Sequence, residues 1–130
     1  MRSEGQHHGL QEIFDRLNRR YFGGRVQAHI TWARQTRPQR RARRSIKLGS
    51  YHSQRQLIRV HPVLDADWVP EYFVSYIVYH EMLHQVVPPQ SVSGRRDFHG
   101  PKFRAHERRF EQYDAAIAWE RDHLDKLLRG

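Results

Sequence analysis

This 130-residue sequence contains no cysteine. The absence excludes disulfides, cysteine-based zinc fingers, iron–sulfur clusters and thiol nucleophiles. No apolar run approaches the ~18 residues that a membrane-spanning helix needs, and the opening MRSEGQHHGL lacks the hydrophobic stretch of a signal peptide. Acidic residues are also scarce, with 14 of them against 23 lysines and arginines. We therefore expect one cytoplasmic domain over residues 1–130, without a membrane partner.

The net charge of +9 is carried mainly by arginine, and its densest segment is 34–47. A charge of this sign favours nucleic acid, because neutralising phosphates releases counterions. Trp32 and Tyr51 flank the segment and could stack on the bases of single-stranded DNA, although Trp32 falls on a predicted buried face. The alternative is a solvated basic loop. The candidate nucleic-acid contacts are Arg37, Arg40, Arg41, Arg43, Arg44 and Lys47.

Hydrophobic periodicity predicts an α+β fold with an N-terminal helix, a three-stranded antiparallel sheet and three further helices. The predicted elements are a helix over 9–22, strands over 25–34, 45–51 and 56–61, and helices over 70–87, 101–113 and from 114 onward. The last two strands should form a hairpin that turns near His52. Residues 34–45 and 88–97 are predicted to be loops.

The helix over 70–87 contains the motif HEMLH, which places His80 and His84 four residues apart. This spacing puts both imidazoles on one face, about one turn apart, where they can bind one zinc ion. Glu81 lies beside them, close enough to act as the general base of an HExxH site. A buried histidine pair without a metal would need other polar partners, so we favour the metal site over an accidental match.

A catalytic zinc ion needs a third protein ligand and one open position. The extended motif HExxHxxGxxH is absent, because Val87 and Gln90 occupy the positions of its glycine and its last histidine. Three downstream carboxylates are eligible: Glu107, Glu111 and Glu120. His99 is the better candidate, because it precedes Gly100-Pro101 at the mouth of a predicted helix, after a loop able to reverse direction. His106 is expected to pack rather than to bind metal.

Several segments resemble the SprT-like metalloproteases, the group that includes the Spartan proteases. The resemblance rests on YHEMLH, the following 14-residue gap and HGPKF, and on LNRRYFGGRV, ITWAR and LGSYHSQRQLIRVHPVLD upstream, over about residues 9–112. It implies a zincin-like fold, one zinc ion held by His80, His84 and His99, and Glu81 as catalytic base. Many members carry a C-terminal zinc ribbon of cysteines, which this sequence does not have.

These features together predict a zinc-dependent endopeptidase that hydrolyses peptide bonds through a zinc-activated water. The predicted strand over 55–61 would offer its edge to an extended peptide, and the basic segment would bring the enzyme to proteins associated with nucleic acid. Two alternatives stay open. One is a nucleic-acid-binding protein with a structural or vestigial zinc site, for which Glu111 or His106 would close the coordination shell. The other is a zinc hydrolase acting on RNA or another non-peptide substrate.

Overall fold

A computed structural model describes residues 2–34 and 46–130, apart from the side chain of Val92. The elements in chain order are α1 (Leu10–Phe22), β1 (His29–Trp32), β2 (Gly49–His52), β3 (Leu57–Val60), a 3-10 turn η1 (Pro62–Leu64), α2 (Glu71–Val86), β4 (Gln90–Val92), β5 (Arg95–Asp97), α3 (Pro101–Glu107) and α4 (Tyr113–Arg129). The α+β class is as predicted. Within the described residues, no helix is both long enough and apolar enough to cross a membrane.

The three-stranded sheet is mixed, so the prediction of an antiparallel sheet is wrong. Its strand order is β1-β3-β2, with β2 antiparallel to β3 as the predicted hairpin requires. Strand β1 runs parallel to β3, with Ile30 opposite Ile58. The reason is that β3 returns from its hairpin into the position between β1 and β2. Strands β1 and β2 thereby become the two edges of the sheet.

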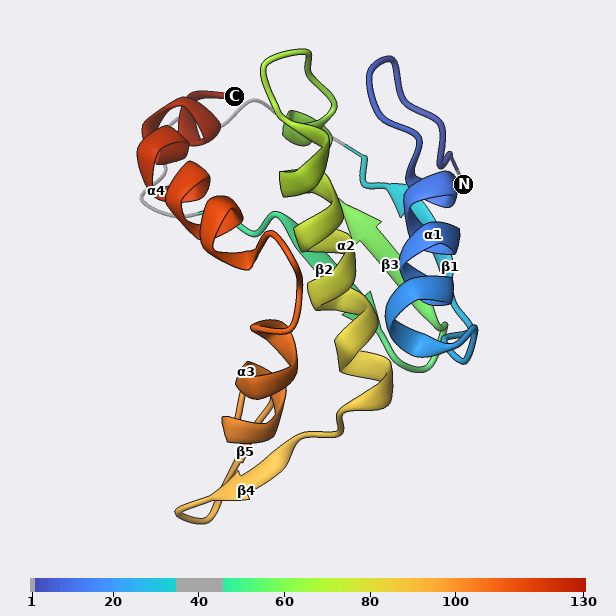
Figure 1. Cartoon of the computed structure of the whole chain (residues 1–130), viewed down its shortest axis with the longest axis vertical. Helices are drawn as coiled ribbons and strands as arrows, with labels where there is room; N and C mark the ends of the chain where they lie inside the picture. The colour runs from blue at the N-terminus through green and yellow to red at the C-terminus, as the bar shows by residue number, and fades with distance from the viewer. Residues whose placement is uncertain (1, 35–45) are drawn as a thin grey trace.

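Helix α2 passes through the centre of the molecule, where it packs against β2 and β3 and contacts α1, α3 and α4 (Figure 1). Its buried residues occur on all sides and form the continuous run from Phe73 to Tyr79, then Glu81 to Leu83. A helix that is apolar around its whole circumference belongs in a core rather than on a surface. Helix α1 packs beside α2, and α4 packs against it near its N-terminal half.

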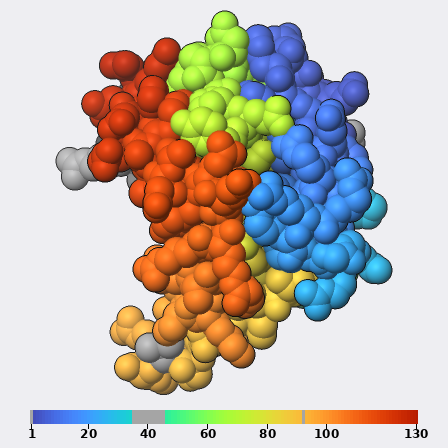
Figure 2. Space-filling model, in the orientation of Figure 1, coloured from blue at the N-terminus to red at the C-terminus, as the bar shows by residue number. Residues whose placement is uncertain are grey.

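Strands β4 and β5 form a short hairpin in the segment that the sequence predicted to be a polar loop. Its turn residues Ser93 and Gly94 both have positive φ, 52° and 78°. Two positive values in a two-residue turn match the twist of an antiparallel pair, which explains how a polar segment can form a hairpin. Together with α3 the hairpin makes a projecting part of the molecule, here called the lobe (residues 90–107), at the bottom of Figure 2.

Helix α3 is shorter than predicted, because the chain turns after Glu107 instead of continuing to residue 113. The turn brings Phe110 into the core, where its ring lies 5.3 Å from that of Tyr79 and 5.9 Å from that of Tyr21. The Tyr79 hydroxyl also donates to the carbonyl oxygen of His106 at 2.6 Å. These contacts fasten the inner end of the lobe to the core.

Candidate metal centre

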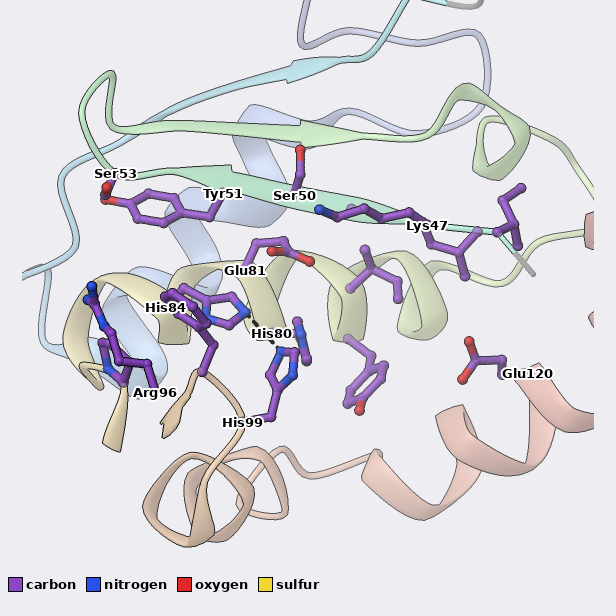
Figure 3. A pocket seen from close by; sticks show the side chains of 17 residues that line it. Lys47, Ser50, Tyr51, Ser53, His80, Glu81, His84, Arg96, His99 and Glu120 are labelled. Atoms are coloured by element: carbon purple, nitrogen blue, oxygen red, sulfur yellow. Dashed lines mark hydrogen bonds between the residues drawn. The ribbon is translucent and has the colours of Figure 1, made fainter. Parts of the chain in front are cut away.

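Helix α2 presents His80, Glu81 and His84 toward the sheet and the lobe (Figure 3). The rings of the two histidines have centroids 5.1 Å apart, as expected for side chains one helical turn apart. Both are half-buried, whereas Glu81 is buried. The packed core around α2 therefore fixes the backbone from which all three side chains project.

His99 lies immediately before the first turn of α3 and completes a triangle with the two helical histidines. Its ring centroid is 5.0 Å from each of the other two, and its Nε2 lies 3.2 Å from the Nε2 of His84. One nitrogen from each of the three rings lies within 4.8 Å of the others, so the group could hold a single metal ion. The Phe103 ring packs against all three imidazoles, with centroid distances of 4.6 to 5.0 Å.

Glu107 holds His80 in place instead of joining the group of three. Its Oε2 lies 2.6 Å from the Nδ1 of His80, so the Nε2 of that ring is left to face the other two imidazoles. Burial alone would raise the pKa of Glu107, but the hydrogen bond and charge of His80, and a hydrogen bond from Tyr76, hold that pKa below its usual value. A carboxylate that orients the ring of a metal-binding histidine is a common feature of zinc sites. The sequence indicated Glu107 only as an eligible metal ligand and did not reveal that it orients His80.

The pKa values of His84 and His99 favour metal binding. Burial lowers the pKa of His84 to about 4, and burial also lowers the pKa of His99. Both rings are therefore neutral near pH 7. A neutral imidazole has the free lone pair that coordination requires, and no proton must first be displaced.

Glu81 points from α2 into the narrow space below β2 (Figure 3). Burial raises its pKa to about 7, against the opposing charges of His80 and Lys47. Gly49 makes this approach of strand and helix feasible. A Cβ at Gly49 would lie 2.9 Å from Glu81 Oε2 and 2.9 Å from Ile77 Cγ2, closer than real contacts allow. No local signal in the sequence marks Gly49, because its requirement comes from a helix that follows more than twenty residues later.

A cleft of about 670 Å³ runs along the site between β2 and α2. Residues of β2 form one wall, Phe98 and Arg96 of the lobe line one end, and Glu120 of α4 lines the other. The strand edge beside the cleft belongs to β2, since β3 is paired on both sides. The expectation that residues 55–61 offer a free edge is therefore wrong, although the correct strand is their hairpin partner.

Other residues singled out in the sequence lie apart from the three histidines. Glu111 forms an ion pair with Arg20 at 2.5 Å, and His106 Nδ1 lies 3.2 Å from a nitrogen of Arg109. Trp32 is buried in the core, whereas Tyr51 and Lys47 line the cleft. The remaining predicted nucleic-acid contacts lie outside the described residues: Arg37, Arg40, Arg41, Arg43 and Arg44.

The comparison with family models matches the SprT-like family over residues 10–123. The match spans most of the chain and includes every residue of the site described above. The chain therefore belongs to the SprT-like family. Searches of curated proteins and of solved structures find no match.

Proposed function

We propose that this protein is a zinc-dependent endopeptidase with a zincin-like arrangement, contained in one domain. The observation that carries the proposal is the convergence of His80, His84 and His99 next to the buried carboxylate of Glu81, inside an open cleft. Three imidazole donors with an orienting carboxylate suit zinc, which accepts nitrogen ligands in tetrahedral sites. When bound there, zinc would supply a Lewis acid that lowers the pKa of water and polarises a carbonyl.

The proposed role of Glu81 is proton transfer. Its carboxylate accepts a proton from the attacking water and then delivers that proton to the amine of the leaving peptide. A general base works best when its pKa lies near the working pH, and burial raises the pKa of Glu81 to about 7. The close contact of α2 with Gly49 restricts where the carboxylate can move.

The proposed substrate is an extended peptide that adds to the free edge of β2. In an antiparallel pair, successive residues of a strand direct their backbone N–H and C=O groups alternately toward the partner strand and away from it. Leu48 directs its backbone toward the β3 side, because its carbonyl oxygen accepts the N–H of His61. The backbone groups of Gly49 and Tyr51 therefore point to the outer edge, toward the cleft. Backbone pairing of this kind tolerates many sequences, which suits an endopeptidase with broad specificity.

Association with nucleic acid is a second element of the proposal. Besides the predicted contacts at Arg37–Arg44 and Lys47, exposed cations cluster on and just after α3. They are Lys102, Arg104, Arg108 and Arg109, and none of them forms an ion pair with a carboxylate of the described residues. Such a surface favours phosphate backbones through counterion release. This would place the cleft next to proteins bound to DNA, single-stranded DNA in particular.

A nucleic-acid-binding protein with a structural zinc site is the competing function. A structural site closes its coordination shell with a fourth protein ligand. The two residues considered for that role have other partners: Glu111 forms an ion pair with Arg20, and His106 Nδ1 contacts a nitrogen of Arg109. The cleft also leads directly to the three histidines. Both observations favour the enzyme.

The test compares wild type with Glu81→Gln, each loaded with zinc, for metal content and for cleavage of casein. Wild type should bind one zinc ion per chain and cleave casein. Glu81→Gln should retain zinc and lose about 10²–10⁴-fold of the rate, the usual contribution of a general base. The assay is repeated with single-stranded DNA, which should increase cleavage if DNA gathers enzyme and substrate. A wild-type protein that holds zinc and cleaves nothing in either condition contradicts the endopeptidase.

A further inference from the structure

Glu120 is a half-buried carboxylate at one end of the cleft, on the face of α4 that is turned toward α2. In Figure 3 its side chain extends into the cleft, separated from Glu81 along the direction of β2. It takes part in none of the ion pairs formed among the described residues. Burial raises its pKa, the response of a carboxylate that has lost part of its hydration without gaining a close partner.

Lys47, a cation that lines the same cleft, forms no ion pair with Glu120. The Lys47 side chain extends over Glu81 (Figure 3), and its charge acts on Glu81 and His84. Glu107, the other acidic group near this end, is already bonded to His80. Glu120 is thus the one acidic side chain of the cleft wall for which the described residues provide neither a proton-transfer role nor a bonded partner.

The opposite end of the cleft has the opposite charge. Arg96 lines that end, with its guanidinium 5.5 Å from the centroid of the Phe98 ring. Phe98 is 53% exposed, so this end offers an aromatic surface and a cation. A peptide lying along β2 therefore passes from a cationic end, past Glu81, to an anionic end.

We propose that Glu120 forms a subsite that binds a lysine or arginine side chain of the substrate, on one side of the bond to be cleaved. The inference rests on the proposed endopeptidase function and deepens it by naming a preferred residue. A peptide that fills the cleft removes water from Glu120. A cationic side chain replaces that hydration with a charge-assisted hydrogen bond, whereas an apolar side chain leaves the carboxylate unpaired. The preference for a basic residue belongs to the position that faces Glu120, because Glu81 and Glu120 are the two described acidic residues that line the cleft and they lie apart along it.

The first experiment measures cleavage of peptide libraries in which one position at a time is varied around the cleavage site. Wild type should favour lysine and arginine over norleucine at one position, by about 5–10-fold for a partly desolvated ion pair. Glu120→Gln should remove that preference, so that peptides with lysine, arginine or norleucine at that position are cleaved at similar rates. Glu120→Lys should turn the preference toward aspartate and glutamate at the same position.

Two controls separate this subsite from a general effect of charge. Asp122→Asn removes one negative charge from the exposed face of the same helix and should leave the preference intact. Arg96→Gln changes the other end of the cleft and should affect a position on the other side of the cleaved bond. A basic preference that survives Glu120→Gln, or that Asp122→Asn removes equally, overturns the proposal.

A binding measurement keeps the subsite testable if no hydrolysis is found. Fluorescence polarisation compares two labelled peptides, identical except for a central lysine or glutamine, on zinc-loaded Glu81→Gln and on Glu81→Gln/Glu120→Gln. The lysine peptide should bind the first variant about 5–10-fold more tightly, and the double variant should bind both equally. Equal binding to the first variant overturns the subsite. Tighter binding of the lysine peptide without any hydrolysis by wild type supports the subsite and contradicts only the endopeptidase.

Discussion

The candidate metal centre is assembled from two parts of the molecule that are stabilised in different ways. His80 and His84 project from α2, whose residues are packed on all sides in the core. His99 projects from the lobe, is exposed, and follows a hairpin whose described side chains are mostly exposed. Two contacts place it directly: its backbone N–H donates to Asp97 at 2.9 Å, and Phe103 packs on its ring. The side chain of Gln90 accepts a backbone N–H at the start of α3, the helix that follows His99.

This difference indicates how the site divides its tasks. The core half fixes the proposed general base, Glu81, and two of the proposed ligands at the cost of burying Glu81, whose pKa burial raises to about 7. The lobe half contributes the third proposed ligand, His99, and one end of the cleft, and most of its described side chains are exposed, Phe103 and Glu107 excepted. Weakly packed elements open at low free energy, so the lobe is the part able to move when a substrate enters.

The largest expected effects come from removing a ligand on each side. His80→Ala and His99→Ala should each lower zinc affinity by more than about 100-fold, because two imidazoles cannot replace a three-ligand site. Their effects on the metal-free fold should differ. His80→Ala leaves the buried Glu107 carboxylate without its 2.6 Å partner and should lower the free energy of unfolding by about 3 kcal/mol. His99→Ala removes an exposed side chain and should change it by less than about 0.5 kcal/mol.

Isothermal titration with zinc and urea unfolding with a chelator present measure the two quantities separately. Arg104→Ala, an exposed change in α3, is the matched control and should alter neither. Retention of full zinc affinity in His99→Ala would remove His99 from the site. Equal destabilisation by the two histidine variants would show that the lobe is as tightly coupled to the core as α2 is.

Glu107→Gln tests whether the carboxylate that orients His80, a residue of the core half, contributes to zinc affinity. The amide keeps the size of the side chain but loses the charge that supports the His80 ring. Zinc affinity should fall by about 10–100-fold, as for other groups that orient metal-binding histidines. Gln112→Glu, at the start of α4, restores the net charge in the double variant and should not restore affinity. Unchanged affinity in Glu107→Gln would mean that packing against Phe103 suffices to orient His80.

The sequence predicted the core half well because its information is local. The HEMLH spacing, the apolar run around it and the flanking prolines all lie within twenty residues, and α2 ends within one residue of the predicted limits. His99 was found through Gly100-Pro101, which marks a helix start. Both predictions depended on helical geometry, which is fixed by positions close together in the chain.

The features that the sequence did not reveal depend on contacts between distant segments. The parallel pairing of β1 with β3 follows from which strand occupies the middle, and alternation of side chains is the same for either direction. The need for glycine at position 49 becomes visible only in the folded structure, where a Cβ on β2 would lie too close to the Glu81 side chain. The β4–β5 hairpin was missed because a polar two-residue turn with little apolar alternation is typical of a loop as well.

A pH-dependent test examines Asp65, which follows η1 and binds the N-terminal segment. The carboxylate of Asp65 accepts backbone N–H groups of residues 6–8 at 2.8, 2.8 and 3.1 Å. Burial opposes ionisation, but these hydrogen bonds outweigh it and lower the pKa of Asp65 below its ordinary value of 3.8. A lowered folded-state pKa gives stability that is present above pH 3.8 and is lost as the pH falls through the folded value. Asp65→Asn should cost about 1 kcal/mol at pH 7, and less below pH 4.

Urea unfolding of Asp65→Asn at several pH values measures this contribution, with exposed Asp67→Asn as the control. Zinc affinity at pH 7 should stay that of wild type, since the change lies where η1 meets the N-terminal segment, away from the three histidines. A cost that is the same at pH 3 and pH 7 would show that the amide is tolerated poorly for its shape rather than for its missing charge.

The last prediction isolates the lobe. The Gln90 side-chain oxygen accepts the backbone N–H of Lys102 at 3.0 Å, one of the first-turn groups of α3 that has no partner within the helix. Gln90→Ala removes this cap and should cost about 1 kcal/mol, confined to the lobe. Amide hydrogen exchange over residues 101–107 should become faster, and zinc affinity should fall by about 5-fold because His99 is less ordered before binding.

Gln85→Ala is the matched control, since Gln85 bonds the backbone of Gln27 on the core side at 2.7 Å. That variant should lower global stability without faster exchange in the lobe. If Gln90→Ala instead lowers global stability and leaves exchange over 101–107 unchanged, the lobe and the core unfold as one unit, and His99 is held as firmly as the histidines of α2.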